Sequence, residues 1–204
     1  MINTLVAVVM AMSTVALPAA DSPPPGAVTV EVVTVNGSGC RPGTAAVAPS
    51  PDNATLHVLY SDYLAAVGAG TRPTDYRKNC QLNLRVNVPQ DFTFAIGQID
   101  YRGFAHLERG ATGTQRGTYY FAGMPQVTNK SHTWQGPLDD NWQATDTIDT
   151  PFYRPCGVPG NLNINTELRV SVGTSDPKTT SYMAMDSTDA YFATVYHLVW
   201  KRCP

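Results

Sequence analysis

Two rows of polar side chains offer the clearest chemistry in this sequence. Between Asn161 and Val172 apolar residues alternate with polar ones, and the polar positions are Asn161, Asn163, Asn165, Glu167, Arg169 and Ser171. A similar row of Asn83, Arg85 and Asn87 lies between Gln81 and Val88. Because residues two apart on a β-strand point to the same side, each row lies on one strand face. Amide and guanidinium groups arranged in this way can hydrogen-bond the hydroxyl groups of a carbohydrate.

The asparagines run against local preference, since Asn is depleted in β-strands. We therefore expect a ligand-binding surface here, with aromatic rings supplied by nearby loops, Trp134 among them. The candidate ligand-binding residues are Asn163, Asn165, Glu167, Arg169, Tyr101 and Trp142. Two structural interpretations stand beside this one: a solvated face of low charge, and a hydrogen-bonded ladder buried between two sheets.

A glycan-active hydrolase is the enzymatic alternative. Such an enzyme needs two carboxyl groups about 5 to 10 Å apart, which any part of the fold can contribute. The chain has three glutamates, and Glu108 and Glu167 are the candidate pair because each lies late in a strand region beside an arginine. The simpler interpretation is an exposed ion pair on a strand face, and such pairs contribute little.

Other catalytic signatures are absent from the sequence. It contains no G-x-S-x-G motif, and the four histidines are far apart. His57 and His197 are expected to be strand residues satisfied by their neighbours. Acidic groups such as Asp139-Asp140-Asn141 match no calcium-loop pattern, and turn or capping roles explain them better. We therefore expect no catalytic residue, no metal and no cofactor.

Four cysteines indicate disulfides in an exported chain, and they allow three pairings. Cys40 with Cys80 and Cys156 with Cys203 are favoured, because each pair closes a loop within one half of the chain. Three N-x-[ST] sequons fit the same compartment, with acceptors at Asn36, Asn53 and Asn129.

The segment from Met1 to Ala20 has no charged side chain and an apolar stretch followed by small residues, which is typical of a secretory signal peptide. Residues 21–26 are a Pro-rich spacer, and residues 27–204 are expected to form a single secreted domain. No later stretch is long and apolar enough to span a bilayer. A formal net charge of -2 argues against nucleic acid as a partner. We expect a monomer without a membrane partner.

Period-two alternation dominates the chain and helical periodicity is almost absent. The predicted strands are Val28–Val32, Thr55–Tyr60, Gln81–Val88, Phe92–Glu108, Gln115–Ala122, Asn161–Val172 and Phe192–Lys201. Nine or ten short strands in all predict an all-β fold, an antiparallel two-sheet β-sandwich of Greek-key or jelly-roll type with two disulfides. Buried positions should include Leu84, Val86, Ile164, Leu168, Leu198 and Trp200.

Four local features complete this expectation. The apolar residues of Phe92–Glu108 change phase at Gly97, which predicts a β-bulge there. Tyr63 to Val67 is the one place where a helical turn is expected. The stretches around Trp134 and Trp142 are interpreted as long connections. Residues Ala144 to Gly160 are the candidate exposed loop for a protein that acts as a protease inhibitor.

Several short motifs occur in an order that resembles one known family. They are Asn36-Gly37-Ser38-Gly39-Cys40, Ser50-Pro51-Asp52-Asn53, Arg77-Lys78-Asn79-Cys80-Gln81-Leu82, Tyr101-Arg102-Gly103, Asp140-Asn141-Trp142, Pro155-Cys156 and Leu162-Asn163-Ile164-Asn165-Thr166. Together they resemble small secreted fungal and streptomycete proteins catalogued as domain of unknown function 4360. The resemblance runs from about Val30 to Cys203 and implies a secreted, disulfide-bonded, all-β domain. It supplies no reaction, substrate or catalytic residue.

The sequence therefore predicts a secreted, non-enzymatic β-sandwich that binds a cell-wall polysaccharide or an extracellular protein. The glycan-active hydrolase and the inhibitor-like interaction protein remain the alternatives. Whether the row containing Asn163 and Asn165 is open or covered distinguishes a site from a scaffold.

Overall fold

A computed structural model describes residues 22–158, 160–185 and 194–204, and every regular element in them is a β-strand. The predicted signal peptide, residue 21 of the spacer and the first two residues of the predicted last strand lie outside this part of the chain. The strands are β1 (Thr29–Asn36), β2 (Ala45–Pro49), β3 (Thr55–Tyr60), β4 (Leu64–Gly68), β5 (Arg77–Asn87), β6 (Phe92–Leu107), β7 (Thr112–Phe121), β8 (Thr128–Gln135), β9 (Leu138–Thr147), β10 (Asn161–Ser171), β11 (Thr180–Ala184) and β12 (Thr194–Arg202). None of the described residues forms a helix that could cross a membrane.

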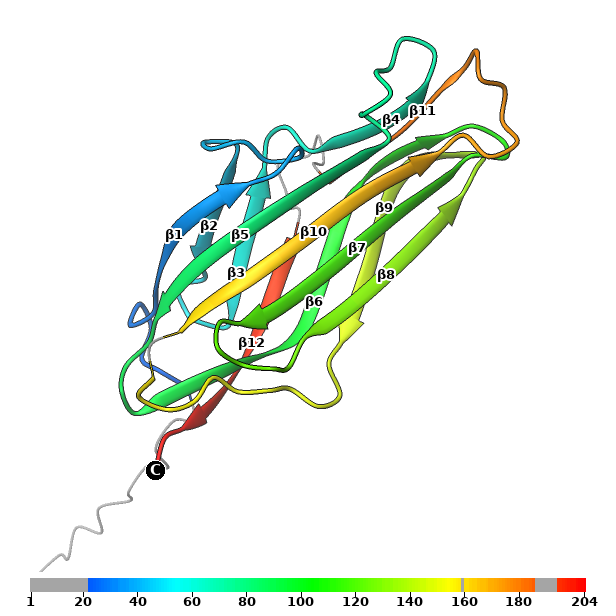
Figure 1. The fold of residues 1–204 in the computed structure, drawn as a ribbon. Coiled ribbons are helices and arrows are strands. Elements are labelled where there is room, and N and C mark those ends of the chain that lie inside the picture. The colour runs from blue at the N-terminus through cyan, green and yellow to red at the C-terminus, as the bar shows by residue number, and fades with distance from the viewer. Residues whose placement is uncertain (1–21, 159, 186–193) are drawn as a thin grey trace, which may run out of the picture.

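The strands form two antiparallel sheets that face each other, as Figure 1 shows. One sheet has five strands in the order β1-β5-β10-β7-β8. The other has seven: β2-β3-β12-β6-β11-β4 along its path, with β9 paired to β6. The predicted all-β, two-sheet sandwich is therefore confirmed. The described residues hold twelve strands, against the nine or ten expected.

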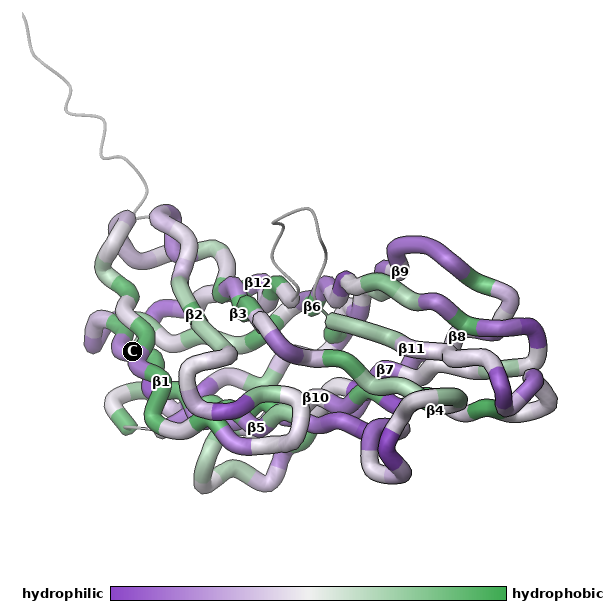
Figure 2. The backbone as a smooth tube through the Cα atoms, turned by 90° about the horizontal axis from the view of Figure 1, so that it is seen from above, coloured by the Kyte–Doolittle hydropathy of each residue, from purple (hydrophilic) through white to green (hydrophobic). Residues whose placement is uncertain are grey.

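The core lies between the sheets and follows from the alternation of residue types along the strands, which Figure 2 shows as alternating colours. On β10 the residues Leu162, Ile164 and Leu168 are buried, as are Leu84 and Val86 on β5. Burial of apolar area at about 25 cal/mol per Å² is the main force that holds the two sheets together. On the last strand Leu198 is buried as predicted, whereas Trp200 is only partly buried.

The predicted β-bulge at Gly97 is confirmed. Along the β6–β12 ladder His197 pairs with Gln98 while the next residue, Leu198, pairs with Ile96, so Gly97 is the extra residue. A bulge shifts the side-chain alternation by one position. Ile96 before it and Ile99 after it are therefore both buried.

Both predicted disulfides are present. Cys40 pairs with Cys80, and both cysteines are buried. Cys156 pairs with Cys203 and joins the connection before β10 to the end of β12. No free cysteine occurs in the described residues. Cross-links of this kind typically contribute about 2 to 4 kcal/mol to folding stability.

Three local predictions were wrong. The segment expected to form a helical turn is the strand β4, which pairs with β11. A short apolar run fits either element, and here pairing with a neighbouring strand decides. The stretches around Trp134 and Trp142 are the strands β8 and β9, which meet at Gly136-Pro137. Their inward positions carry few aliphatic residues, so the apolar alternation that identifies a strand is weak.

Candidate functional site

The outward side chains of β5, β10, β7 and β8 form what we call the polar face. The register places Asn163 of β10 opposite Asn83 of β5, and Asn165 opposite Gln81. Asn165 also pairs with Thr118 of β7. Paired residues therefore form rows that cross several strands of the sheet, and we call each such row a rung. Within the part of the chain that the structure describes, no second layer covers these side chains, which are half-buried or exposed. The predicted asparagine row is therefore an outer surface and not a ladder buried between the sheets.

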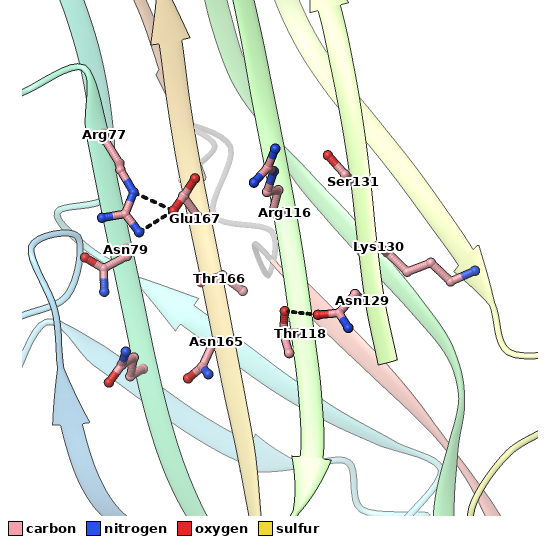
Figure 3. A pocket seen from close by; sticks show the side chains of 11 residues that line it. Arg77, Asn79, Arg116, Thr118, Asn129, Lys130, Ser131, Asn165, Thr166 and Glu167 are labelled. Atoms are coloured by element: carbon pink, nitrogen blue, oxygen red, sulfur yellow. Dashed lines mark hydrogen bonds and ion pairs between the residues drawn. The ribbon is translucent and has the colours of Figure 1, made fainter. Parts of the chain in front are cut away.

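A hollow of about 460 Å³ lies on the polar face. We call it the first hollow, and Figure 3 shows the side chains around it. Its lining residues are Arg77, Asn79, Gln81, Arg116, Thr118, Asn129, Lys130, Ser131, Asn165, Thr166 and Glu167. Four neighbouring strands supply these residues, so the sheet itself holds them in place. A rigid sheet positions polar groups for binding better than a loop does.

Part of the amide row is already hydrogen-bonded within the protein. Asn161 Nδ2 donates to Asn83 Oδ1 at 2.7 Å, and Asn83 Nδ2 donates to Asn163 Oδ1 at 2.7 Å. On the next rung the side chains of Gln81 and Asn165 make no hydrogen bond to any described residue. These two amides keep their full capacity to donate and accept.

Glu167 is held between two arginines at one end of the first hollow. Arg77 Nε donates to Glu167 Oε2 at 2.5 Å, and this bond raises the pKa of the Arg77 guanidinium above its ordinary value. Arg169 lies 3.2 Å from Glu167 Oε1, but the two groups are not aligned for a hydrogen bond. Across the rung Arg116 faces Glu167 and forms no ion pair with a described residue. Arg116 is exposed and lines the hollow as a cation whose donors no carboxylate of the described residues uses.

A second hollow of about 600 Å³ adjoins the first, since Gln81 and Asn165 line both. It brings in Tyr120 of β7, a half-buried aromatic residue beside Asn163. Tyr120 is not among the residues predicted from the sequence. Strand alternation contained the signal, because Tyr120 shares its parity with the outward Arg116 and Thr118.

Tyr101 and Trp142 do not lie in loops beside this row, contrary to the sequence-based expectation. Tyr101 is on β6, 1% exposed, and its hydroxyl fills the space that Gly117 leaves open beneath β7. Trp142 is on β9, 3% exposed, and its Nε1 donates to the carbonyl of Ala184. Both rings belong to the core. Tyr101 points inward because it follows the bulge at Gly97, and Trp142 occupies an inward position of β9.

The fold does not bring Glu108 and Glu167 together. Glu167 points outward from the five-stranded sheet, whereas Glu108 directly follows β6 of the other sheet and lies 3.7 Å from His106. Facing sheets pack about 10 Å apart, so side chains on opposite outer faces are farther apart than a hydrolytic carboxyl pair requires.

The outer face of the seven-stranded sheet carries histidines and carboxylates that satisfy one another. His197 Nε2 lies 2.7 Å from Asp100 Oδ2, and Thr145 donates to Asp100 Oδ1. Partial burial acts to raise the pKa of Asp100, but hydrogen bonds from Thr145, His197 and Gln98 together hold it below its usual value. His57 Nε2 lies 2.7 Å from Thr55 Oγ1. Nowhere in the described residues do three or more His, Cys, Asp or Glu gather as a metal site would need.

The segment predicted as an exposed loop is largely held against the sandwich. Ala144 to Thr147 are part of β9, and the Ile148 amide donates to the carbonyl of Gly97. Phe152 packs against the rings of Tyr119 and Phe121. Residues 155–158 of the segment are exposed and carry the Cys156–Cys203 disulfide.

Comparison with known proteins places this arrangement in a family. The family described as Domain of unknown function (DUF4360) matches residues 26–203. A protein of Arthroderma benhamiae, named "Uncharacterized secreted protein", is 36% identical over 185 residues, which are 90% of this chain and 75% of that relative. No solved structure matched the chain. Since the family matches nearly all of the chain after residue 25 and the relative is 36% identical over 90% of it, this chain belongs to the DUF4360 family.

Proposed function

We propose that this protein is a secreted, non-enzymatic binding protein whose polar face takes a hydroxyl-rich carbohydrate such as a cell-wall polysaccharide. Secretion is supported by the signal-peptide pattern of Met1 to Ala20 and by the name of the Arthroderma benhamiae relative. The observation that carries the proposal is the open rung of Gln81 and Asn165, whose side-chain amides bond to no described residue where two hollows meet.

The chemistry around that rung suits sugar rings. An amide both donates and accepts, as a hydroxyl group does, so one Gln or Asn can bind two neighbouring hydroxyls. Tyr120 adds an aromatic surface in the second hollow, where the apolar C–H side of a sugar ring can pack. Arg116 adds donors that no carboxylate of the described residues occupies. Because these groups lie on strands, binding does not have to order the backbone, and the entropy cost is limited to the side chains that it fixes.

The test is retention of the purified protein on insoluble cell-wall polysaccharides, with the soluble fraction assayed for released sugar. We expect the parent protein to be retained and Gln81→Ala to lose affinity by about 2- to 10-fold, the equivalent of one net hydrogen bond of 0.5 to 1.5 kcal/mol. Tyr120→Ala should weaken retention as well.

The matched control is Gln143→Ala on β9, which removes the same amide from an exposed strand position of the other sheet. Its retention should equal that of the parent. Equal loss in Gln81→Ala and Gln143→Ala would contradict a site on the polar face. Release of soluble sugar would contradict the proposed binding function and support the glycan-active hydrolase.

A further inference from the structure

The three sequons occupy very different places in the fold. Asn36 is the last residue of β1, and Asn129 is the second residue of β8. These are the two edge strands of the five-stranded sheet, and both asparagines are exposed. Asn129 Oδ1 accepts a hydrogen bond from Thr118, and Nδ2, the nitrogen that would carry a sugar, donates to no described residue. The Asn36 amide nitrogen likewise donates to no described residue.

Asn53 lies in a closed environment between β2 and β3. It is 0% exposed, and its Nδ2 donates to the carbonyls of Pro23 at 3.3 Å and Pro24 at 2.6 Å. A sugar on that nitrogen would replace a donor hydrogen and would need volume that the Pro-rich segment occupies. A chain modified there cannot dock this segment as the structure has it.

We propose that Asn36 and Asn129 carry N-linked glycans in the mature protein and that Asn53 carries none. The donor is the lipid-linked oligosaccharide diphosphate of a eukaryotic secretory pathway. The side-chain nitrogen forms a bond to the anomeric carbon, the bond from that carbon to the diphosphate oxygen breaks, and the amide gives up one proton. The lipid diphosphate leaves.

Their positions give these glycans a physical role. An edge strand presents unpaired N–H and C=O groups that can pair with the edge of another molecule. One glycan on β1 and one on β8 place a bulky, hydrated group at each edge of the five-stranded sheet. The Asn129 side chain also lines the first hollow, so its glycan narrows access to the polar face. This last consequence rests on the proposed function, whereas the two modification sites do not.

The experiment uses the full chain secreted from a eukaryotic host. Peptide-N-glycosidase in heavy-oxygen water converts each glycosylated asparagine into a labelled aspartate, which peptide mapping then locates. We expect label at positions 36 and 129 and an unmodified asparagine at position 53. Label at position 53, or an unlabelled position 36 or 129, overturns the proposal.

Ser131 supplies a matched pair of variants. Ser131→Ala abolishes the Asn129 sequon and should lower the intact mass by one glycan, whereas Ser131→Thr keeps the sequon and the mass of a two-glycan protein. Combining Asn36→Gln with Ser131→Ala should increase self-association in light scattering relative to Asn36→Gln with Ser131→Thr. Equal self-association in the two double variants overturns the edge role.

The same variants separate this inference from the proposed function. Ser131→Ala should be retained on polysaccharide more strongly than Ser131→Thr, because the hollow is then unobstructed. If no variant is retained at all while the masses follow the pattern above, the glycan sites stand and the carbohydrate-binding proposal fails. If retention is normal while position 129 is unmodified, the carbohydrate-binding proposal stands and the glycan-site proposal fails.

Discussion

The outer faces of the two sheets are both polar, yet they differ in what their polar groups are free to do. On the seven-stranded sheet Asp100 accepts hydrogen bonds from Thr145, Gln98 and His197. On the five-stranded sheet Gln81 and Asn165 have no hydrogen-bond partner among the described residues, although they line two hollows. Polarity on a strand face is therefore a poor marker of a binding site. Unused hydrogen-bonding capacity in a concave surface is a better one.

The largest expected effect sharpens the contrast between the two sides of one strand. Leu168→Ala on the inner side of β10 should lower the free energy of unfolding by about 2 to 5 kcal/mol, through lost transfer energy and a cavity. Denaturant unfolding of parent and variant measures this. A cost below about 1 kcal/mol would mean that β10 does not pack against the core as described.

A smaller effect is expected on the seven-stranded sheet. Asp100→Asn removes the charged acceptor from His197 and Thr145 and should cost about 1 to 3 kcal/mol, because hydrogen bonds to charged groups are the stronger ones. Retention on polysaccharide should stay at the parent level, since this face is not the proposed site. Loss of retention together with normal stability would reverse our assignment of the two faces.

The pH dependence of the stability that Asp100 contributes gives a finer test. The pKa of Asp100 is lowered in the folded protein, so the unfolded chain binds its proton more readily. The contribution of Asp100 to the free energy of unfolding is fully present above the unfolded-state pKa of about 3.9. It is lost as the pH falls from there through the folded-state pKa. The difference in unfolding free energy between parent and Asp100→Asn should shrink in that range. A difference that stays constant from pH 7 into acid would contradict this contribution.

The smallest stability effect belongs to the polar face. Replacing Asn165 and Glu167 together with Thr should change the free energy of unfolding by no more than about 1 kcal/mol, because Arg77 and Arg169 stay in contact with water after Glu167 is removed and Thr suits a strand better. Retention on polysaccharide should fall at the same time. A loss of stability of several kcal/mol, with no retention of the parent protein on polysaccharide, would show that the row is scaffold and would end the binding hypothesis.

Sequence periodicity was sufficient where one strand face is strongly apolar. The strands β5 and β10 and the bulge at Gly97 were predicted because their inward positions carry Leu, Ile and Val in clear alternation. It failed for β8 and β9, whose inward residues include His132 and Asp146, joined at 3.0 Å. A histidine and a carboxylate that bury each other across two sheets cannot be recognised as a core pair from either strand alone.

For the candidate site, too, the sequence determined one part and the tertiary structure decided the rest. Alternation by itself determined that Asn163, Asn165, Glu167 and Arg169 share one face, because the geometry of a strand repeats every two residues. Only the tertiary structure decided that this face is open, that Tyr120 lines a hollow on it and that Trp142 is in the core. Those facts depend on which strands become neighbours and in what register. Pairing joins residues as far apart in the sequence as Thr55 and His197, and its energy is distributed over the whole sandwich, so no local segment of sequence contains it.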